Sequence, residues 1–517
     1  MIKSKHFSRP LKTYLVPKHS DVETRLGALA FVSPRVRIRR QPAPFFTLFL
    51  CICALIVAYP LFQSSAQPAP QQPAAATAAA RNAALIAATG EVLKETSDLR
   101  QLPIMKSVPS STQSREEIQR AVVKNLDEGT SPAELHASEV LLKELGLVPP
   151  GFHYRDLMVR LLTEQVAGYY EPKTQQFYLA DWIDVDGQRP VMAHELTHAL
   201  QDQHFNLRRF EKWPKGDSDA ELAAHSLIEG DATLAMVIYV ASNPLRALTF
   251  LKSISAMGAV SEELNKAPRA VRESLPFPYQ EGLNWTRELY RRGGWNEVSQ
   301  AFTTLPASTE QILHPEKYFA HEAPVKVALP DLTAILNQKG QKSDVRGQRP
   351  EVRSQNFGRA QKGLKPKPNT QPASSWKRIS SDVNGEFGLY LILDQFLKSP
   401  AESRRAVAGW GGDRFDLYEN ATGEVVYVSM SAWDTETDAR EFFDAYVKRV
   451  QLQYPTAERN KASDTVIFGT NDGEVLVALK GLRVFTIGTP QSLKPESLLC
   501  ALDAPNCRAP MAMLFSR

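Results

Sequence analysis

One almost unbroken apolar run, Pro44–Phe62, divides this chain of 517 residues into two very unequal parts. The run is about as long as a helix that crosses the hydrocarbon core of a bilayer. Arginines crowd the segment just before it, Arg35–Arg40, and such a basic flank predicts that residues 1–43 stay in the cytoplasm while the rest is exported. Because Ser64–Ala66 would suit a signal peptidase, residues 44–62 are predicted to be either a retained membrane anchor or a cleaved signal.

Cysteine usage and charge agree with an exported protein. Cys500 and Cys507 bracket a short loop and could form a disulfide in an oxidising compartment, with two free thiols as the alternative. The formal net charge of +4 is small for this length, so nucleic acid is not expected as a partner. We expect a protein of the cell envelope, tethered to the membrane by its N-terminal helix or secreted. The sequence carries no indication of its oligomeric state.

Changes in composition predict the domain boundaries. Residues 63–82 form a Pro/Ala/Gln-rich linker that cannot bury a core. Residues 83–330 show mainly helical patterns and form the first domain. Residues 331–378 are expected to be a basic disordered linker, since eleven Lys/Arg face only two acidic residues between residues 338 and 378. Residues 379–517 alternate helical and strand patterns, which predicts a smaller α+β domain.

Periodicity places the main elements of the α+β fold. Helices are expected at 191–203 and 221–241, and two aromatic runs joined by a polar turn predict a β-hairpin at Tyr169–Leu179. In the second domain the patterns predict two helices and four strands, namely helices 389–397 and 436–450 and strands 424–429, 465–468, 474–479 and 484–487.

The segment around His194 carries the pattern His-Glu-x-x-His. On a helix, His194 and His198 share a face, so that both imidazoles can reach one metal ion, and Glu195 points beside the ion. A catalytic zinc lowers the pKa of its bound water, and a neighbouring carboxylate can take the proton. The remaining positions of this helix are apolar, which favours a buried helix over a surface helix with incidental histidines.

A catalytic zinc needs a third protein ligand, and the sequence offers two main candidates. Glu229 lies in an apolar helical stretch, where a carboxylate is costly to bury unless it is paired or bound to metal. His204 has the spacing of the extended motif that ends in a third histidine, but that motif needs a glycine where this chain has Gln201. Glu229 is therefore favoured over His204, and His225 and Asp231 remain further alternatives.

These residues give the chain a resemblance to known enzymes. Two histidines plus a glutamate on a later helix resemble the glutamate zincins, of which thermolysin is the familiar case, and imply a Zn²⁺ cofactor. The wider pattern resembles a family of exported prokaryotic surface metallopeptidase-like proteins, and the resemblance spans about residues 150–450. The quoted segments are Leu162–Pro172, His194–Phe205, Glu229–Ala232, Ser308–Tyr318 and, weakly, Gly409–Asp413.

The resemblance also implies further site residues. Enzymes of the thermolysin type place an aspartate four residues after the glutamate ligand, whereas this chain has Thr233 there, which leaves Asp231 as a substitute partner for the zinc histidines. Zincins bind extended substrates along an edge strand, for which the hairpin is the candidate, although it could equally be a purely structural part of the sheet.

A donor to the oxyanion is also needed, and a histidine or tyrosine downstream of the motif suits this role. We expect His314 first, with Tyr279 and Tyr318 as alternatives. Trp410 and Asp413 are interpreted as parts of a tight turn that needs glycine.

The prediction is therefore a zincin-like metallopeptidase domain, residues 83–330, that hydrolyses a protein or peptide substrate. His194, His198 and Glu229 would bind Zn²⁺, and Glu195 would act as general base. The alternative is a non-catalytic envelope binding protein with a structural or vestigial zinc, in which Glu195 would have no function. Metal-dependent hydrolysis of a non-peptide bond would use the same residues.

Overall fold

The computed structural model describes residues 74–248 except 184 and 214, residue 250, and residues 262–344 and 375–503. The predicted anchor or signal at 44–62 lies outside these ranges, as does Cys507. Cys500 is disulfide-bonded. Within the described ranges, no helix is both long and apolar enough to span a bilayer.

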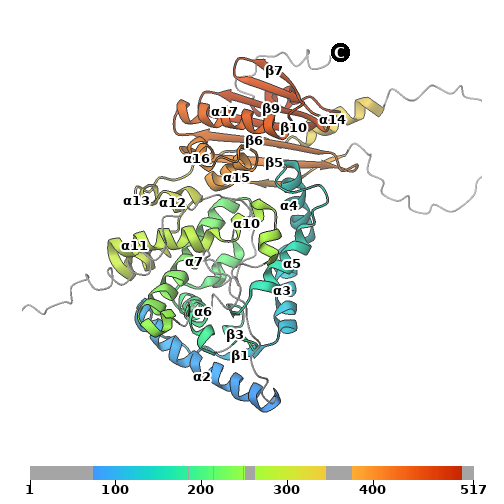
Figure 1. Ribbon diagram of the computed structural model, residues 1–517. Helices are drawn as coiled ribbons and strands as arrows, with labels where there is room; N and C mark the ends of the chain where they lie inside the picture. The colour runs from blue at the N-terminus through green and yellow to red at the C-terminus, as the bar shows by residue number, and fades with distance from the viewer. Residues whose placement is uncertain are drawn as a thin grey trace, which may run out of the picture.

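Helices make up most of the first part of the chain (Figure 1). Several of these helices begin at a side chain that caps their first turn. Ser114 and Ser131 form capping boxes at the starts of α3 and α4, and Asp217 caps α7. The helices are α2 (Ala74–Arg100), α3 (Arg115–Gly129), α4 (Pro132–Glu144), α5 (Tyr154–Gln165), α6 (Val185–Phe205), α7 (Ser218–Ala241), α9 (Glu262–Lys266), α10 (Arg269–Ser274), α11 (Phe277–Ala301), α12 (Thr309–Leu313) and α13 (Pro315–Phe319), with a 3₁₀ helix at Leu207–Lys212.

A small sheet accompanies these helices. The hairpin predicted from the aromatic runs is present as antiparallel strands β2 (Gly168–Glu171) and β3 (Gln176–Ala180). A third strand, β1 (Ser110–Gln113), pairs in parallel with the other side of β3, so the order is β1-β3-β2 and β2 is an edge strand. The edge strand β2 packs against α6, the helix that carries the histidine motif.

The C-terminal part is built on an antiparallel seven-stranded sheet, which Figure 1 shows at the top. Helices α15 (Gly385–Leu397), α16 (Pro400–Val407) and α17 (Glu436–Gln453) pack on one side of it, and α14 (Thr333–Asp344) and α18 (Glu496–Leu502) contribute to a second apolar cluster. Helices followed by a mainly antiparallel sheet confirm the predicted α+β class. The order is β4 (Trp376–Asp382), β5 (Trp410–Asn420), β6 (Val425–Trp433), β10 (Arg483–Pro490), β9 (Gly473–Lys480), β8 (Thr465–Gly469) and β7 (Glu458–Ala462).

The structure differs from the predicted linkers at their edges. Residues 74–82 belong to α2, because alanine has the highest helix propensity. In the stretch 331–378, residues 333–344 form α14, and Leu332 and Leu336 are fully buried against the C-terminal sheet. Residues 345–374 lie outside the described ranges.

The glycine-rich stretch at Gly409 is also different from its prediction. Only Gly409 has a positive φ, of 77°, and Trp410 already begins β5 rather than forming a tight turn. The Asp413 carboxylate accepts hydrogen bonds from the Trp410 indole and from the backbone at Asn384 and Gly385, which makes it a structural residue.

The two parts of the chain share one hydrophobic core. A single apolar cluster runs from the helices of the first part to α15, α17 and the sheet. The rings of Phe277 and Phe387 meet across the junction with their centroids 3.5 Å apart. At the start of α7, the backbone N–H of Ser218 donates to the Asp382 carboxylate of β4 at 2.8 Å. The C-terminal part therefore helps to hold α7, which bears Glu229.

Candidate metal centre

Helix α6 is enclosed on several sides. It packs against α2, α7 and the edge strand β2, and its residues from Pro190 to Asp202 are buried without interruption. A helix that is buried on all sides presents its polar side chains to other protein groups rather than to water, so each of these groups needs a partner. The histidine motif lies in the middle of this buried stretch.

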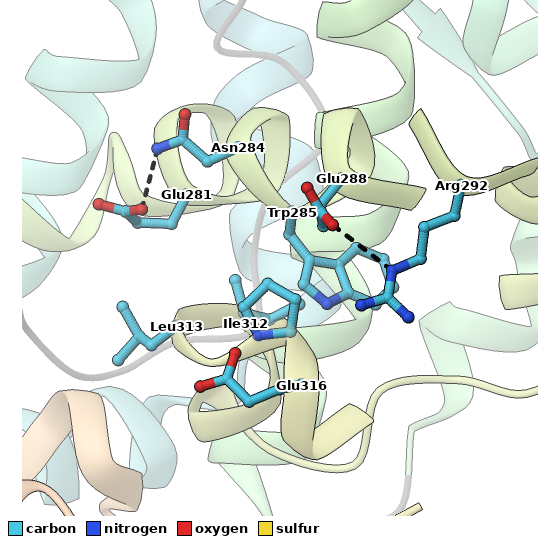
Figure 2. Close-up of a pocket in the computed structure, with 9 residues that line it drawn as sticks. Glu281, Asn284, Trp285, Glu288, Arg292, Ile312, Leu313 and Glu316 are labelled. Atoms are coloured by element: carbon cyan, nitrogen blue, oxygen red, sulfur yellow. Dashed lines mark hydrogen bonds and ion pairs between the residues drawn. The ribbon is translucent and has the colours of Figure 1, made fainter. Parts of the chain in front are cut away.

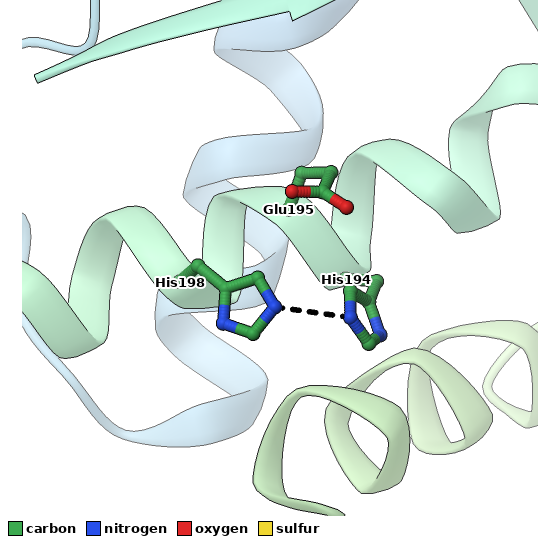
Figure 3. A group of neighbouring side chains, drawn as sticks. All are labelled: His194, Glu195 and His198. Atoms are coloured by element: carbon green, nitrogen blue, oxygen red, sulfur yellow. Dashed lines mark hydrogen bonds between the residues drawn. The ribbon is translucent and has the colours of Figure 1, made fainter. Parts of the chain in front are cut away.

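Three side chains from α6 and α7 converge on one point. His194 Nε2 lies 3.1 Å from Glu229 Oε2 and 3.1 Å from His198 Nε2. His198 Nε2 lies 3.4 Å from the same Glu229 oxygen. Figure 3 shows the two imidazoles turned toward each other on one side of α6, with Glu195 on a neighbouring side. The side chains of the two histidines and Glu229 are at most 3% exposed.

These three atoms fit a zinc ion. When ligands lie about 2.0–2.1 Å from zinc, two corners of the coordination tetrahedron are about 3.3–3.4 Å apart. The observed separations of 3.1, 3.1 and 3.4 Å are close to those of one tetrahedral face. Two imidazoles and one carboxylate also form the donor set of catalytic zinc sites that leave the fourth position open.

Glu195 also lies next to this face. One of its carboxylate oxygens and one ring nitrogen from each of His194 and His198 lie within 4.8 Å of one another. Glu195 Oε2 accepts the backbone N–H of Tyr170, on the edge strand β2, at 2.9 Å. A hydrogen bond to a backbone donor fixes the orientation of the carboxylate, so Glu195 is held beside the site by the strand expected to receive substrate.

Gln201 determines which ring nitrogen of His198 carries the proton. The Gln201 amide nitrogen donates to the backbone oxygen of Ile228 at 3.0 Å and to Asp231 Oδ2 at 2.9 Å. This orientation leaves Gln201 Oε1 as the acceptor for His198 Nδ1, 2.9 Å away. A proton on Nδ1 leaves the lone pair of Nε2 directed at the metal position.

The charges of the site are strongly coupled. Burial alone would raise the pKa of Glu229, but the facing imidazoles of His198 and His194 outweigh it and hold that pKa at about 2. Burial opposes a charged imidazole, yet the Glu229 carboxylate raises the pKa of His198 to about 9. Without metal, the site therefore holds a carboxylate and an imidazolium at neutral pH, and a metal ion takes the place of a proton.

The other sequence candidates are distributed over the molecule. His204 binds the backbone oxygen of Pro103 at 2.8 Å, on the far end of α6 from His194. His225 lies on α7 one turn before Glu229, where burial lowers its pKa. Asp231, two residues beyond Glu229, contacts Gln201 rather than the ligand position.

The three candidates for the oxyanion donor lie in different parts of the fold. His314 Nε2 lies 3.0 Å from Glu386 of α15, and α12 and α13, which flank His314, lie well away from α6 in Figure 1. The hydroxyl of Tyr318 donates to the backbone oxygen of Thr304 at 2.7 Å. Tyr279 is the candidate at the site, since its buried ring stacks on His194 with the ring centroids 6.1 Å apart.

Two glycines bring Tyr279 to this position. Gly230 follows Glu229 on α7, and Gly282 lies one turn after Tyr279 on α11. A Cβ atom on Gly282 would overlap the backbone oxygen of Ser226, and one on Gly230 would overlap the backbone of Gly282. The two helix backbones therefore touch at this crossing, which sets α11 and Tyr279 against the metal centre.

Replacing Gly282 with alanine should force α7 and α11 apart. Such overpacking typically costs about 1–3 kcal/mol of unfolding free energy, which urea denaturation would measure. The matched control is Gly90→Ala in α2, where a Cβ meets nothing within 4 Å. That variant should gain up to about 1 kcal/mol, because alanine is the better helix former. Equal effects of the two substitutions would contradict the close crossing.

A second group of carboxylates is an ion-pair network. Glu310, Glu322 and Asp434 bring oxygens within 4.8 Å of one another. The Lys317 ammonium lies among them, 2.7, 2.6 and 2.9 Å from these three residues. The lysine ammonium pairs with all three carboxylates, so this cluster is assigned as an ion-pair link between α13 and the C-terminal part rather than as a metal site.

A pocket of about 330 Å³ lies between α11, α12 and α13 (Figure 2). Trp285 and Ile312 form part of its wall, and Arg292 binds Glu288 at 3.4 Å within it. Helical spacing puts the pocket residues of α11 on roughly the opposite face from Tyr279 and Gly282. The pocket is therefore separate from the metal centre.

Comparison with known proteins bears on the C-terminal part. Residues 373–496 match a family described as "Domain of unknown function (DUF8575)". No curated protein and no solved structure matches the chain. The family match covers none of the candidate metal-centre residues on α6 and α7, so it gives no information about that site.

Proposed function

We propose that this protein is a zinc-dependent endopeptidase of the cell envelope, with His194, His198 and Glu229 as zinc ligands and Glu195 as general base. The observation that carries the proposal is the triangle of ligand atoms, with sides of 3.1, 3.1 and 3.4 Å, beside the oriented Glu195 carboxylate. A structural zinc site closes its fourth position with a protein ligand. Here Glu195 lies beside the three ligand atoms with one oxygen held by the Tyr170 N–H, an arrangement that suits a general base.

The roles of the residues follow from their positions. When bound, zinc supplies a Lewis acid that polarises the substrate carbonyl and lowers the pKa of a coordinated water. Glu195 accepts the proton of the attacking water and then passes it to the amine leaving group. Tyr279, stacked on His194, donates its hydroxyl to the oxyanion that develops on the carbonyl. Strand β2 offers main-chain groups to an extended substrate.

One observation favours the non-catalytic alternative. The side chains of His194, His198 and Glu229 are almost fully enclosed, and a peptide bond reaches such a site only after a covering segment moves. Metallopeptidase action therefore requires an opening motion, whereas a structural zinc does not. Cleavage activity decides between the two functions, because both predict bound zinc.

The test pairs zinc content with proteolysis on the full-length protein in mild detergent. We expect about one zinc per chain by elemental analysis and cleavage of an unfolded substrate such as casein. A chelator should abolish cleavage, and added Zn²⁺ should restore it. Stoichiometric zinc without cleavage of casein or of a random peptide library would support the binding protein. A folded protein that binds no zinc would refute both.

A further inference from the structure

A chain of buried hydrogen bonds continues outward from the metal centre. It starts at His198, passes through Gln201 and reaches Asp231 Oδ2. The other oxygen of Asp231, Oδ1, accepts the Nε–H of Arg100 at 2.6 Å. Each link is within normal hydrogen-bond length, so a cation on α2 is joined to a zinc ligand on α6 through a carboxylate on α7.

Arg100 is held from several sides. Both of its terminal nitrogens donate to the Ser299 hydroxyl at 3.2 Å. Its guanidinium lies over the Trp295 ring, 4.5 Å from the ring centroid. Trp295 and Ser299 follow a kink in α11 at Gly293–Gly294, where the backbone leaves helical geometry. Arg100 of α2 thus joins α7 and α11 directly, and α6 through Asp231 and Gln201.

The complete burial of the Arg100–Asp231 ion pair points to a role beyond stability. The side chains of Arg100 and Asp231 are both 0% exposed, and removing two charges from water is strongly unfavourable unless the pair is well hydrogen-bonded. A pair that served only stability could be replaced by apolar groups of similar size. The Asp231 carboxylate has a second task, because its other oxygen holds the amide of Gln201 in one orientation.

We propose that Arg100 is a positioning residue for the metal centre. By fixing Asp231, it keeps the Gln201 amide oriented so that Oε1 faces His198 Nδ1, which leaves Nε2 directed at zinc. If the amide turned over, its nitrogen would face Nδ1 and favour the tautomer that protonates Nε2. This inference rests on the proposed zinc site and adds to it a residue of α2, the described helix nearest in sequence to the predicted anchor.

The experiment is a double-mutant cycle on the full-length protein, read as zinc affinity by chelator competition. Arg100→Met should weaken zinc binding by up to the about 10–100-fold that follows loss of a direct partner of a metal ligand. Gln201→Leu, which leaves the Arg100–Asp231 pair in place, should do the same. Because both act through His198, the double variant should bind zinc about as weakly as Gln201→Leu alone.

The absorption spectrum of the Co²⁺-substituted protein provides a second readout. A displaced imidazole changes the coordination geometry, so Arg100→Met and Gln201→Leu should alter the visible bands in the same way. Arg100→Lys, which keeps the charge, should recover part of the zinc affinity. If Arg100→Met fails to fold, the same cycle is run with Arg100→Lys.

Arg160→Met is the control, since Arg160 forms an exposed ion pair with Glu263. It should leave zinc affinity and the Co²⁺ spectrum unchanged. Zinc affinity at the wild-type level in a folded Arg100→Met variant would overturn the inference, as would additive losses in the cycle. A wild-type protein without zinc would instead refute the proposed metal site itself.

Discussion

Replacing Glu195 with glutamine should abolish peptide cleavage while leaving zinc in place. Glutamine keeps the size of the side chain and can still accept the Tyr170 N–H that Glu195 binds at 2.9 Å. It cannot take a proton from water, and general-base catalysis typically contributes about 10²–10⁴-fold to the rate. We expect a fall in kcat of at least this size, measured by cleavage of a fluorescent casein, with zinc content unchanged by elemental analysis.

The control for this variant is Glu128→Gln, which alters a half-exposed carboxylate paired only with surface lysines. It should cleave at the wild-type rate. Cleavage by Glu195→Gln within a few-fold of wild type would show that this carboxylate is not the base. Loss of zinc from this variant would show instead that Glu195 is itself a ligand.

Replacing Glu229 with glutamine should remove most of the zinc affinity. The substitution takes away the anionic ligand, and we expect a loss greater than the approximately 100-fold that partners behind a ligand can account for. Calorimetric titration with Zn²⁺ and a competing chelator would measure it. Asp217→Ala, which removes the N-cap of the same helix, is a control that should lose about 0.5–2 kcal/mol of stability but keep zinc affinity.

The Glu229→Gln variant also tests the effect of the Glu229 carboxylate on the pKa of His198. The pKa of His198 is raised to about 9 by Glu229, so the imidazolium contributes stability to the metal-free protein below its ordinary pKa and loses it as pH rises through about 9. Zinc must displace that proton. Wild-type zinc affinity should therefore rise about tenfold per pH unit from pH 7 to 9 and then level off. In Glu229→Gln the cause of the shift is gone, and the slope should be clearly shallower.

Much of the fold is visible in the sequence because its signals are local. Helices α6 and α7, the hairpin β2–β3 and the C-terminal α15, α17 and β8–β10 follow from periodicity within a few residues. Strand β1 has no alternation of apolar and polar residues, because its sequence Ser110–Gln113 is polar throughout and every residue is half-buried. Strand β5 begins with glycines that suggest a turn. Strand β1 depends on pairing with β3, far along the chain, and β5 on pairing with β4 and β6 on its two sides, rather than on their own residues.

The residues of the candidate metal centre also divide into those that a local sequence pattern predicts and those that no local pattern predicts. His194 and His198 are one helical turn apart, and Glu229 stands out as a carboxylate in an apolar helix, so all three are apparent from local patterns. Gln201, three residues after His198, could have been found by the same helical spacing. Arg100 is 131 positions from Asp231, and no local pattern links them. Tyr279 reaches the site only because two glycines let α7 and α11 touch.

The core shared by the two parts limits how far the C-terminal part can stand alone. Residues 373–496 match one family model, and α15 within them packs Phe387 against Phe277 of the helical part. Without the helical part, residues 373–496 would leave the apolar side chains of α15 that pack on it, Phe387 among them, exposed to water. A protein that carried such a segment without these helices would need other apolar groups to cover Phe387 and its neighbours.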